Sequence, residues 1–133
     1  MAQPKLNEPH EFLASAARTA TATTDGFNVP GMQALCLFLD VTAESSTPQL
    51  TVSLEAKMPD STTYEQVCAF AQIGPSGAGQ FIMMAGPGLL AANVNGTNAQ
   101  GLACYVPPQF RIVSTAADTD SCTYSIKGWC LRG

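Results

Sequence analysis

The stretch LTVSLEAK at residues 50–57 decides the fold class, because apolar and polar side chains alternate along it without a break. Its apolar residues, from Leu50 to Ala56, share one face, and its polar residues, from Thr51 to Lys57, share the other. Alternation with a period of two is typical of a β-strand with one buried and one solvent-facing side. The stretch therefore predicts a strand whose apolar face enters a hydrophobic core.

Strand-like segments recur on both sides of this stretch, and turn-forming pairs such as Asp25–Gly26 and Pro30–Gly31 separate them. In addition to residues 50–57, the predicted strands cover residues 17–24, 33–42, 64–73, 80–86, 110–116 and 122–132. Short strands spaced in this way predict an all-β fold. We expect a single β-sandwich or barrel of about seven to eight antiparallel strands.

Three segments are less regular than the others. Residues 33–42 are apolar on both alternating faces, which predicts a strand buried on both sides. Residues 64–73 fit either a strand or a helix, and their place between two turns favours the strand. Residues 87–109 contain several glycines and amides and a Pro–Pro pair, so we expect a long loop with at most one short extended piece.

The first residues of the chain differ in character from the rest. Residues 1–9, MAQPKLNEP, include two prolines and show no apolar periodicity. We therefore predict an N-terminal arm at residues 1–14 and a β-sandwich domain at residues 15–133. Asn7 could cap a short helix in this arm, whereas an extended arm that docks on another molecule is the alternative.

Composition limits the classes of function. A length of 133 residues suits one domain, and charged residues make up 12% of the chain, against roughly 25% in an average soluble protein. The net charge of −4 argues against binding to a phosphate backbone, so we expect no nucleic-acid partner. The apolar stretches are shorter than a membrane span, and the N-terminus lacks the apolar core of a secretion signal. We therefore expect no membrane partner and synthesis in a cytoplasm.

The chain contains five cysteines, which are Cys36, Cys68, Cys104, Cys122 and Cys130. An odd number without a secretion signal argues against a disulfide framework. Most of the five are therefore predicted to be small buried hydrophobic residues. Because Cys130 lies three residues from the C-terminus, we predict that it is the candidate for a late-forming disulfide between subunits.

Motifs for catalysis and cofactor binding are incomplete. Gly74 and Gly79 have the spacing of a phosphate-binding loop, but Gln80 and Phe81 stand where that loop needs lysine and serine or threonine. His10 is the only histidine, and no two cysteines have the usual spacing of zinc ligands. We therefore expect no enzyme activity, no cofactor and no metal site.

Four aromatic residues lie in or near predicted strands, namely Tyr64, Tyr105, Tyr124 and Trp129. Together they could line a carbohydrate-binding platform on a β-sandwich, although aromatic residues in strands more often pack in the core. This possible platform keeps a module that binds glycans or host surfaces as an alternative function.

Three longer segments carry a family resemblance: ARTATATTDGFNVPG at 17–31, LDVTAESSTPQLTVSLEAKMP at 39–59 and PPQFRIVSTAADTDSCTYSIKG at 107–128. Their order, with a Pro–Gly pair at 87–88 between the last two, resembles that of small all-β virion proteins of tailed phages and prophages. The resemblance is strongest to capsid cement, or decoration, proteins. It covers roughly residues 17–128, but the N-terminal arm, the long loop and the five cysteines are not part of the pattern that carries it.

The resemblance implies a function without catalysis. A cement protein binds the exterior of the assembled head and stabilises contacts between major capsid protein subunits. The implied partners are the major capsid protein and further copies of this chain, with a trimer favoured over a dimer. In this interpretation the arm contacts the capsid through Lys5, Leu6, Phe12 and Leu13. A tail or neck component of the virion is the alternative structural role.

Overall fold

The computed structural model describes residues 3–44, 50–70, 79–87, 99–116 and 121–132. Within these ranges the chain forms strands and no helix. The strands are β1 (Pro9–Arg18), β2 (Ala22–Thr23), β3 (Phe27–Asn28), β4 (Ala34–Glu44), β5 (Leu50–Lys57), β6 (Tyr64–Ala69), β7 (Gly79–Gly86), β8 (Ala99–Ala103), β9 (Gln109–Ala116) and β10 (Cys122–Leu131). The expected all-β fold is confirmed.

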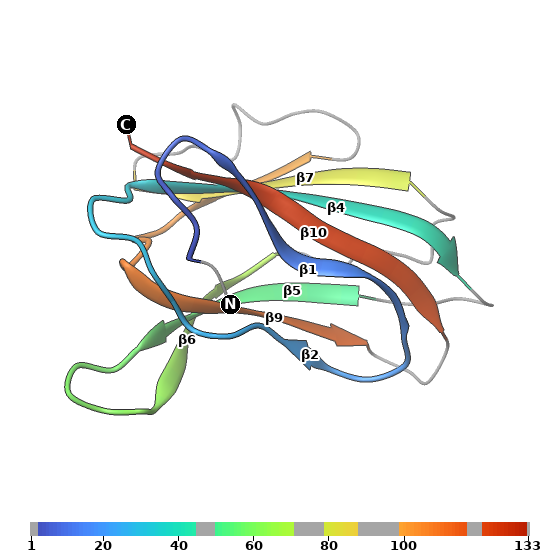
Figure 1. Cartoon of the computed structure of the whole chain (residues 1–133), viewed down its shortest axis with the longest axis horizontal. Coiled ribbons are helices and arrows are strands. Elements are labelled where there is room, and N and C mark those ends of the chain that lie inside the picture. Colours follow the sequence, from blue (N-terminus) through green and yellow to red (C-terminus); the bar gives the residue numbers. More distant parts are fainter. Residues whose placement is uncertain (1–2, 45–49, 71–78, 88–98, 117–120, 133) are drawn as a thin grey trace.

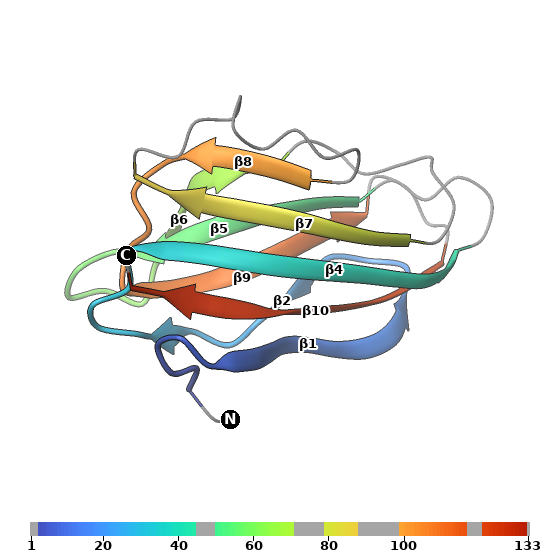
Figure 2. The same ribbon diagram turned by 90° about the horizontal axis from the view of Figure 1, so that it is seen from above.

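The strands form two sheets that lie one above the other, and neither sheet closes into a barrel (Figure 1). The first sheet has the order β1-β10-β4-β7-β8. The second sheet has the order β2-β9-β5-β6, and β3 also pairs with β9. Seen from above, β6 and β8 lie at one edge of the two layers, whereas β1 lies at the opposite edge (Figure 2).

The chain passes repeatedly between the two sheets. Strands β2 and β3 pair with successive parts of β9 and together occupy one edge position. With β8 set aside, β1-β10-β4-β7 therefore faces β2/β3-β9-β5-β6. Two four-stranded sheets wound in this order are typical of a jelly roll, in which two Greek keys share one core.

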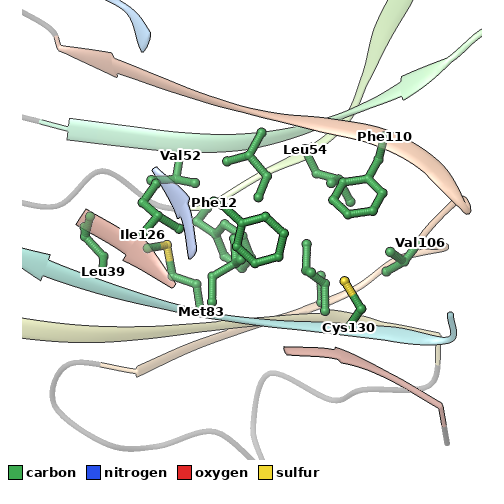
Figure 3. Close-up of a cluster of buried hydrophobic side chains, with 14 of the residues drawn as sticks. Phe12, Leu39, Val52, Leu54, Met83, Val106, Phe110, Ile126 and Cys130 are labelled. Carbon is green, nitrogen blue, oxygen red and sulfur yellow. The ribbon is translucent and has the colours of Figure 1, made fainter. Parts of the chain in front are cut away.

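The hydrophobic core fills the space between the sheets (Figure 3). Alternate residues of the central strands point into it, including Leu37 and Leu39 from β4 and Val52 and Leu54 from β5. The core also contains a polar link between the sheets, since the hydroxyl groups of Ser114 in β9 and Tyr124 in β10 share a short hydrogen bond. Burial of Tyr124 raises the pKa of its hydroxyl, which therefore stays protonated at neutral pH.

The predicted N-terminal arm is wrong for residues 9–14, because these residues belong to β1. Strand β1 pairs with β10 over its length, so the predicted boundary after residue 14 falls inside a strand. Phe12 is only 2% exposed and packs against Phe27 and Phe110, with ring centroids 5.4 Å and 6.5 Å away. The short helix that Asn7 could cap does not form either, since the residues from 9 onward are extended.

Several strand predictions are confirmed, and two details are corrected. The predicted segments 33–42, 50–57, 64–73, 80–86, 110–116 and 122–132 each contain a strand. Residues 17–24 do not form one strand, because β1 ends at Arg18 and β2 begins at Ala22. The long segment 87–109 contains β8, which pairs with β7 in parallel, so the expected sheet of antiparallel strands alone is wrong. Residues 88–98 of that segment lie outside the described residues.

Candidate functional site

The outer face of the first sheet carries an apolar surface. We call it the apolar strip, and it consists of Cys36, Phe38, Ile82, Met84, Trp129 and Leu131. These residues alternate along β4, β7 and β10 with buried residues that point into the core. Phe38 and Ile82 are each 36% exposed, and the other four residues are half-buried. Six apolar residues on one solvent-facing side of a sheet suggest a surface that another molecule covers.

The register of the strands brings these side chains side by side. Cys36 in β4 lies opposite Trp129 on one side and Met84 on the other. Two residues further along β4, Phe38 lies opposite Ile82 in β7. The rings of Phe38 and Trp129 meet edge to face at a centroid distance of 5.3 Å. Because both aromatic residues stand on central strands, the sheet holds them rigidly in place.

Two hollows adjoin the apolar strip. A hollow of about 360 Å³ lies beside Cys36, Met84 and Leu131, and its walls are almost entirely apolar. A second hollow of about 190 Å³ is lined by the apolar residues Phe38 and Leu39 and by four polar residues, which are Asp40, Gln80, Ser125 and Lys127. The apolar strip therefore combines the aromatic pair of Phe38 and Trp129 with an apolar hollow and with neighbouring polar residues. Aromatic residues and methionine at the centre and polar groups at the rim are typical of protein–protein interfaces.

A third hollow extends the apolar hollow toward Tyr105. It has a volume of about 480 Å³ and shares Ala34 and Pro87 with the hollow beside Met84. Tyr105 is 68% exposed and stands in its wall. The exposed aromatic surface of the first sheet thus continues past the end of β8.

The outer face of the second sheet is different in character. Arg111 in β9 donates a hydrogen bond from Nε to Glu55 Oε1 in β5, at 2.7 Å. The same guanidinium group lies 4.2 Å from the ring centroid of Tyr64 in β6. These contacts satisfy the charges within the sheet itself and add stability to it. This face therefore offers less apolar surface to a partner than the apolar strip does.

His10 is the only histidine of the chain and is the first residue to consider for acid–base chemistry. His10 packs among aromatic rings, with centroids 4.9 Å from Phe12 and 5.7 Å from Phe27. Burial lowers the pKa of His10, and its Nε2 has no hydrogen-bond partner among the described residues. The described residues contain no group of three or more His, Cys, Asp or Glu side chains placed to hold a metal ion.

A pocket of about 460 Å³ lies at one end of the two sheets. Four prolines line it, and Lys57 is the only charged residue among the described residues of its wall. A lysine without an adjacent base or carboxylate in the pocket wall is not an arrangement for nucleophilic or acid–base catalysis. No helix among the described residues has both the length and the apolar character of a membrane span.

The structure separates the four residues predicted for the arm contact. Lys5 is exposed, and Leu6 is partly buried and forms a parallel bridge with Cys130. Leu13 is half-buried in β1. Phe12 cannot act as a capsid contact, because its side chain lies in the core of this chain.

The structure argues against the predicted disulfide at Cys130. Cys130 is fully buried in β10 and pairs with Leu35 of β4, although it is close to the C-terminus in sequence. Burial raises the pKa of its thiol to about 12, so the reactive thiolate is rare at neutral pH. A disulfide between subunits would require β10 to leave the core.

The predicted aromatic platform does not form. Tyr124 lies in the core, and Tyr64 lies on the second sheet. Trp129 and Tyr105 belong to the side of the first sheet instead. The apolar strip itself was missed because residues 33–42 predict a strand buried on both sides, whereas Phe38 is exposed.

Comparison of the chain with protein-family models, with curated proteins and with solved structures found no match. The apolar strip and the strand order therefore carry the functional argument.

Proposed function

We propose that this chain is a phage capsid cement protein that docks on the exterior of the assembled head through the apolar strip. The observation that carries the proposal is the row of Phe38, Ile82, Met84 and Trp129 on a rigid, solvent-facing sheet. In this role the chain binds across contacts between major capsid protein subunits and opposes their separation. The proposed mechanism is mechanical and needs neither catalysis nor a cofactor.

Two further features support this proposal. The jelly-roll strand order is shared by viral capsid domains and lectin domains, so it fits a virion protein without identifying one. The low charged fraction of 12% suits a protein that buries much of its surface, because charged residues are depleted at interface cores. The segments that resemble virion proteins contribute several of the strands that form the two sheets.

Many identical docking sites multiply a modest affinity. Burial of the apolar strip supplies roughly 25 cal/mol for each Å² of apolar surface removed from water. A symmetric head repeats this contact over its whole surface, and copies that also bind one another engage several sites at once. We propose a homo-oligomer for this reason, with a trimer favoured over a dimer. Synthesis in the host cytoplasm precedes attachment to the head exterior.

Density-gradient sedimentation of a lysate from the source organism tests this function. Peptide mass spectrometry across the gradient should find the chain with full heads, at a copy number comparable to the main shell protein. If the chain follows only tails, it is a tail or neck component instead. If it stays at the top of the gradient, both virion roles fail, and Tyr105 beside its hollow makes glycan screens the next step.

A matched pair of variants locates the docking surface. Phe38→Asp places a charge at the centre of the apolar strip and should abolish co-sedimentation with heads. Met58→Asp is the control, because Met58 is 43% exposed and lies beyond the end of β5 in the second sheet. Phe38→Asp also loses the aromatic contact with Trp129, so its Tm should fall by several degrees while the protein stays folded. Met58→Asp should keep the Tm of the parent protein within about 2 °C. Equal binding by both variants would refute the apolar strip as the docking surface.

A further inference from the structure

Two cysteines meet at the edge of the molecule opposite β1. Cys68 belongs to β6, the edge strand of the second sheet, and Cys104 follows β8, the edge strand of the first sheet. Their Sγ atoms are 3.2 Å apart, and both residues are half-buried against the core. The residues come from different sheets and lie 36 positions apart in sequence. Spacing along the chain therefore does not reveal the pair.

The backbone holds both cysteines in position. Cys68 lies opposite Leu54 in the antiparallel pair of β5 and β6. The amide of Cys104 donates a hydrogen bond to the carbonyl oxygen of Gly86 at the end of β7, with a distance of 3.2 Å. A disulfide bond is about 2.05 Å long, so the two sulfur atoms need to approach by only about 1 Å. The described residues place no third Cys, His, Asp or Glu with them as a metal site would require.

We propose that Cys68 and Cys104 form an intramolecular disulfide when the protein leaves the reducing cytoplasm, and that this bond clamps the two sheets together. At the opposite edge the chain itself runs from β1 in the first sheet to β2 in the second. At the β6–β8 edge the chain runs from β8 to β9, an inner strand of the second sheet, and the thiol contact joins the end of β8 directly to the edge strand β6. A covalent bond there resists the separation of the two sheets at this edge. The proposal concerns the fold and does not depend on the proposed capsid function.

The chemistry is a thiol–disulfide exchange with a small disulfide such as oxidised glutathione. One thiolate attacks the small disulfide, forms a mixed disulfide and releases one small thiol. The second thiolate then attacks the sulfur of the first cysteine and releases the other small thiol. Two S–H bonds and one S–S bond break, one protein S–S bond forms, and the small disulfide receives both electrons and both protons.

The protonation of Cys68 favours a slow reaction. Burial, with a smaller contribution from the contact with Cys104, raises the pKa of the Cys68 thiol to about 12. Whichever cysteine attacks the small disulfide first, the Cys68 thiolate must act in one of the two steps. The reduced pair is therefore oxidised slowly at neutral pH. Such a bond forms late, after prolonged contact with an oxidising medium.

Non-reducing peptide mapping of the whole protein tests the proposal. No Lys or Arg lies between Lys57 and Arg111, so trypsin leaves both cysteines in one peptide, and that peptide should lose two hydrogen atoms on oxidation. Peptic digestion at low pH, which prevents disulfide exchange, should then yield a Cys68–Cys104 linked pair. Oxidation with excess oxidised glutathione should raise Tm by roughly 10 °C, and a phosphine reductant should reverse the shift.

Single variants provide the controls. Cys68→Ser and Cys104→Ser should each abolish the linked peptide and the oxidation-dependent shift in Tm. Cys36→Ser should retain both, because Cys36 lies on the outer face of β4 rather than at the β6–β8 edge. The proposal is overturned if the oxidised wild-type protein links other cysteines, forms disulfide-bonded dimers or keeps all five thiols free.

Discussion

Replacing Phe12 by alanine measures whether β1 is part of the folded domain or a separate arm. Phe12 is 2% exposed, and its ring contacts Phe27 and Phe110 across the gap between the sheets. Figure 3 shows the ring in the middle of the core, between side chains from both sheets. An arm that docks on a partner would leave this side chain in water in the free protein.

The expected cost follows from the buried area. A buried phenylalanine removes at least about 150 Å² of apolar surface from water, which corresponds to about 4 kcal/mol at 25 cal/mol per Å². Measured costs of Phe→Ala in cores cover the same range, about 3–5 kcal/mol. For a chain of 133 residues, each 1 kcal/mol shifts Tm by roughly 3–5 °C. Phe12→Ala should therefore lower Tm by roughly 12–20 °C.

Differential scanning calorimetry of the free protein provides the assay, and Glu11→Ala is the matched control on the neighbouring position. Glu11 is exposed, and its carboxylate lies 3.9 Å from Lys127 Nζ, a surface ion pair worth at most about 0.5 kcal/mol. Its removal should shift Tm by no more than about 2 °C. If the Tm of Phe12→Ala equals that of Glu11→Ala, β1 does not belong to the core and the description of the fold is wrong.

Three further substitutions test the packing between strands and the buried polar groups. A methyl group in Gly128→Ala would clash with the backbone of β4, so the variant should lose about 1–3 kcal/mol or more in chemical denaturation. The control Gly79→Ala should lose less than about 1 kcal/mol, because its methyl group would meet the Phe81 ring at an ordinary contact distance of 3.8 Å. Tyr124→Phe removes the partner of Ser114 and should cost about 1–3 kcal/mol in the same assay, with partial recovery in the double variant that also carries Ser114→Ala. Burial holds the pKa of His10 in the folded chain below 6.5. As the pH falls below 6.5, the unfolded chain therefore binds more protons than the folded chain does. The contribution of neutral His10 to the free energy of unfolding is fully present above pH 6.5 and is lost as the pH falls through the folded pKa. His10→Phe should flatten the decline of Tm on acidification, and an unchanged pH profile would contradict this assignment.

The sequence predicted the central strands well because their side chains face one core. Residues 50–57 alternate without interruption, and β5 has the expected bounds. Strand β1 escaped prediction for a physical reason. Register shifts between Glu11 and Leu13 and between Leu13 and Ala16 break the period of two, so the apolar residues no longer mark one face. The alternation that identifies a strand is absent there, although the backbone pairing is present.

The features of the surface depend on tertiary structure and were not predictable from one sequence. Phe38 and Leu39 are similar in hydrophobicity, and only the packing of the second sheet decides which of them is buried. The contact between Cys68 and Cys104 depends on how the edges of two sheets meet. Proximity to the C-terminus pointed to Cys130 instead, but Cys130 stands on the face of β10 that points into the core and is buried there.

Hydroxyl-radical footprinting tests the central claim, that the apolar strip attaches this chain to the capsid. The oxidation of side chains is compared between the free protein and purified particles that carry it. Met84 and Trp129 probe the apolar strip, whereas Met58 and Tyr64 probe the region of the second sheet. The account predicts that Met84 and Trp129 become protected on the particle while Met58 and Tyr64 keep their reactivity. Protection of Met58 and Tyr64 with unchanged reactivity of Met84 and Trp129 would contradict it.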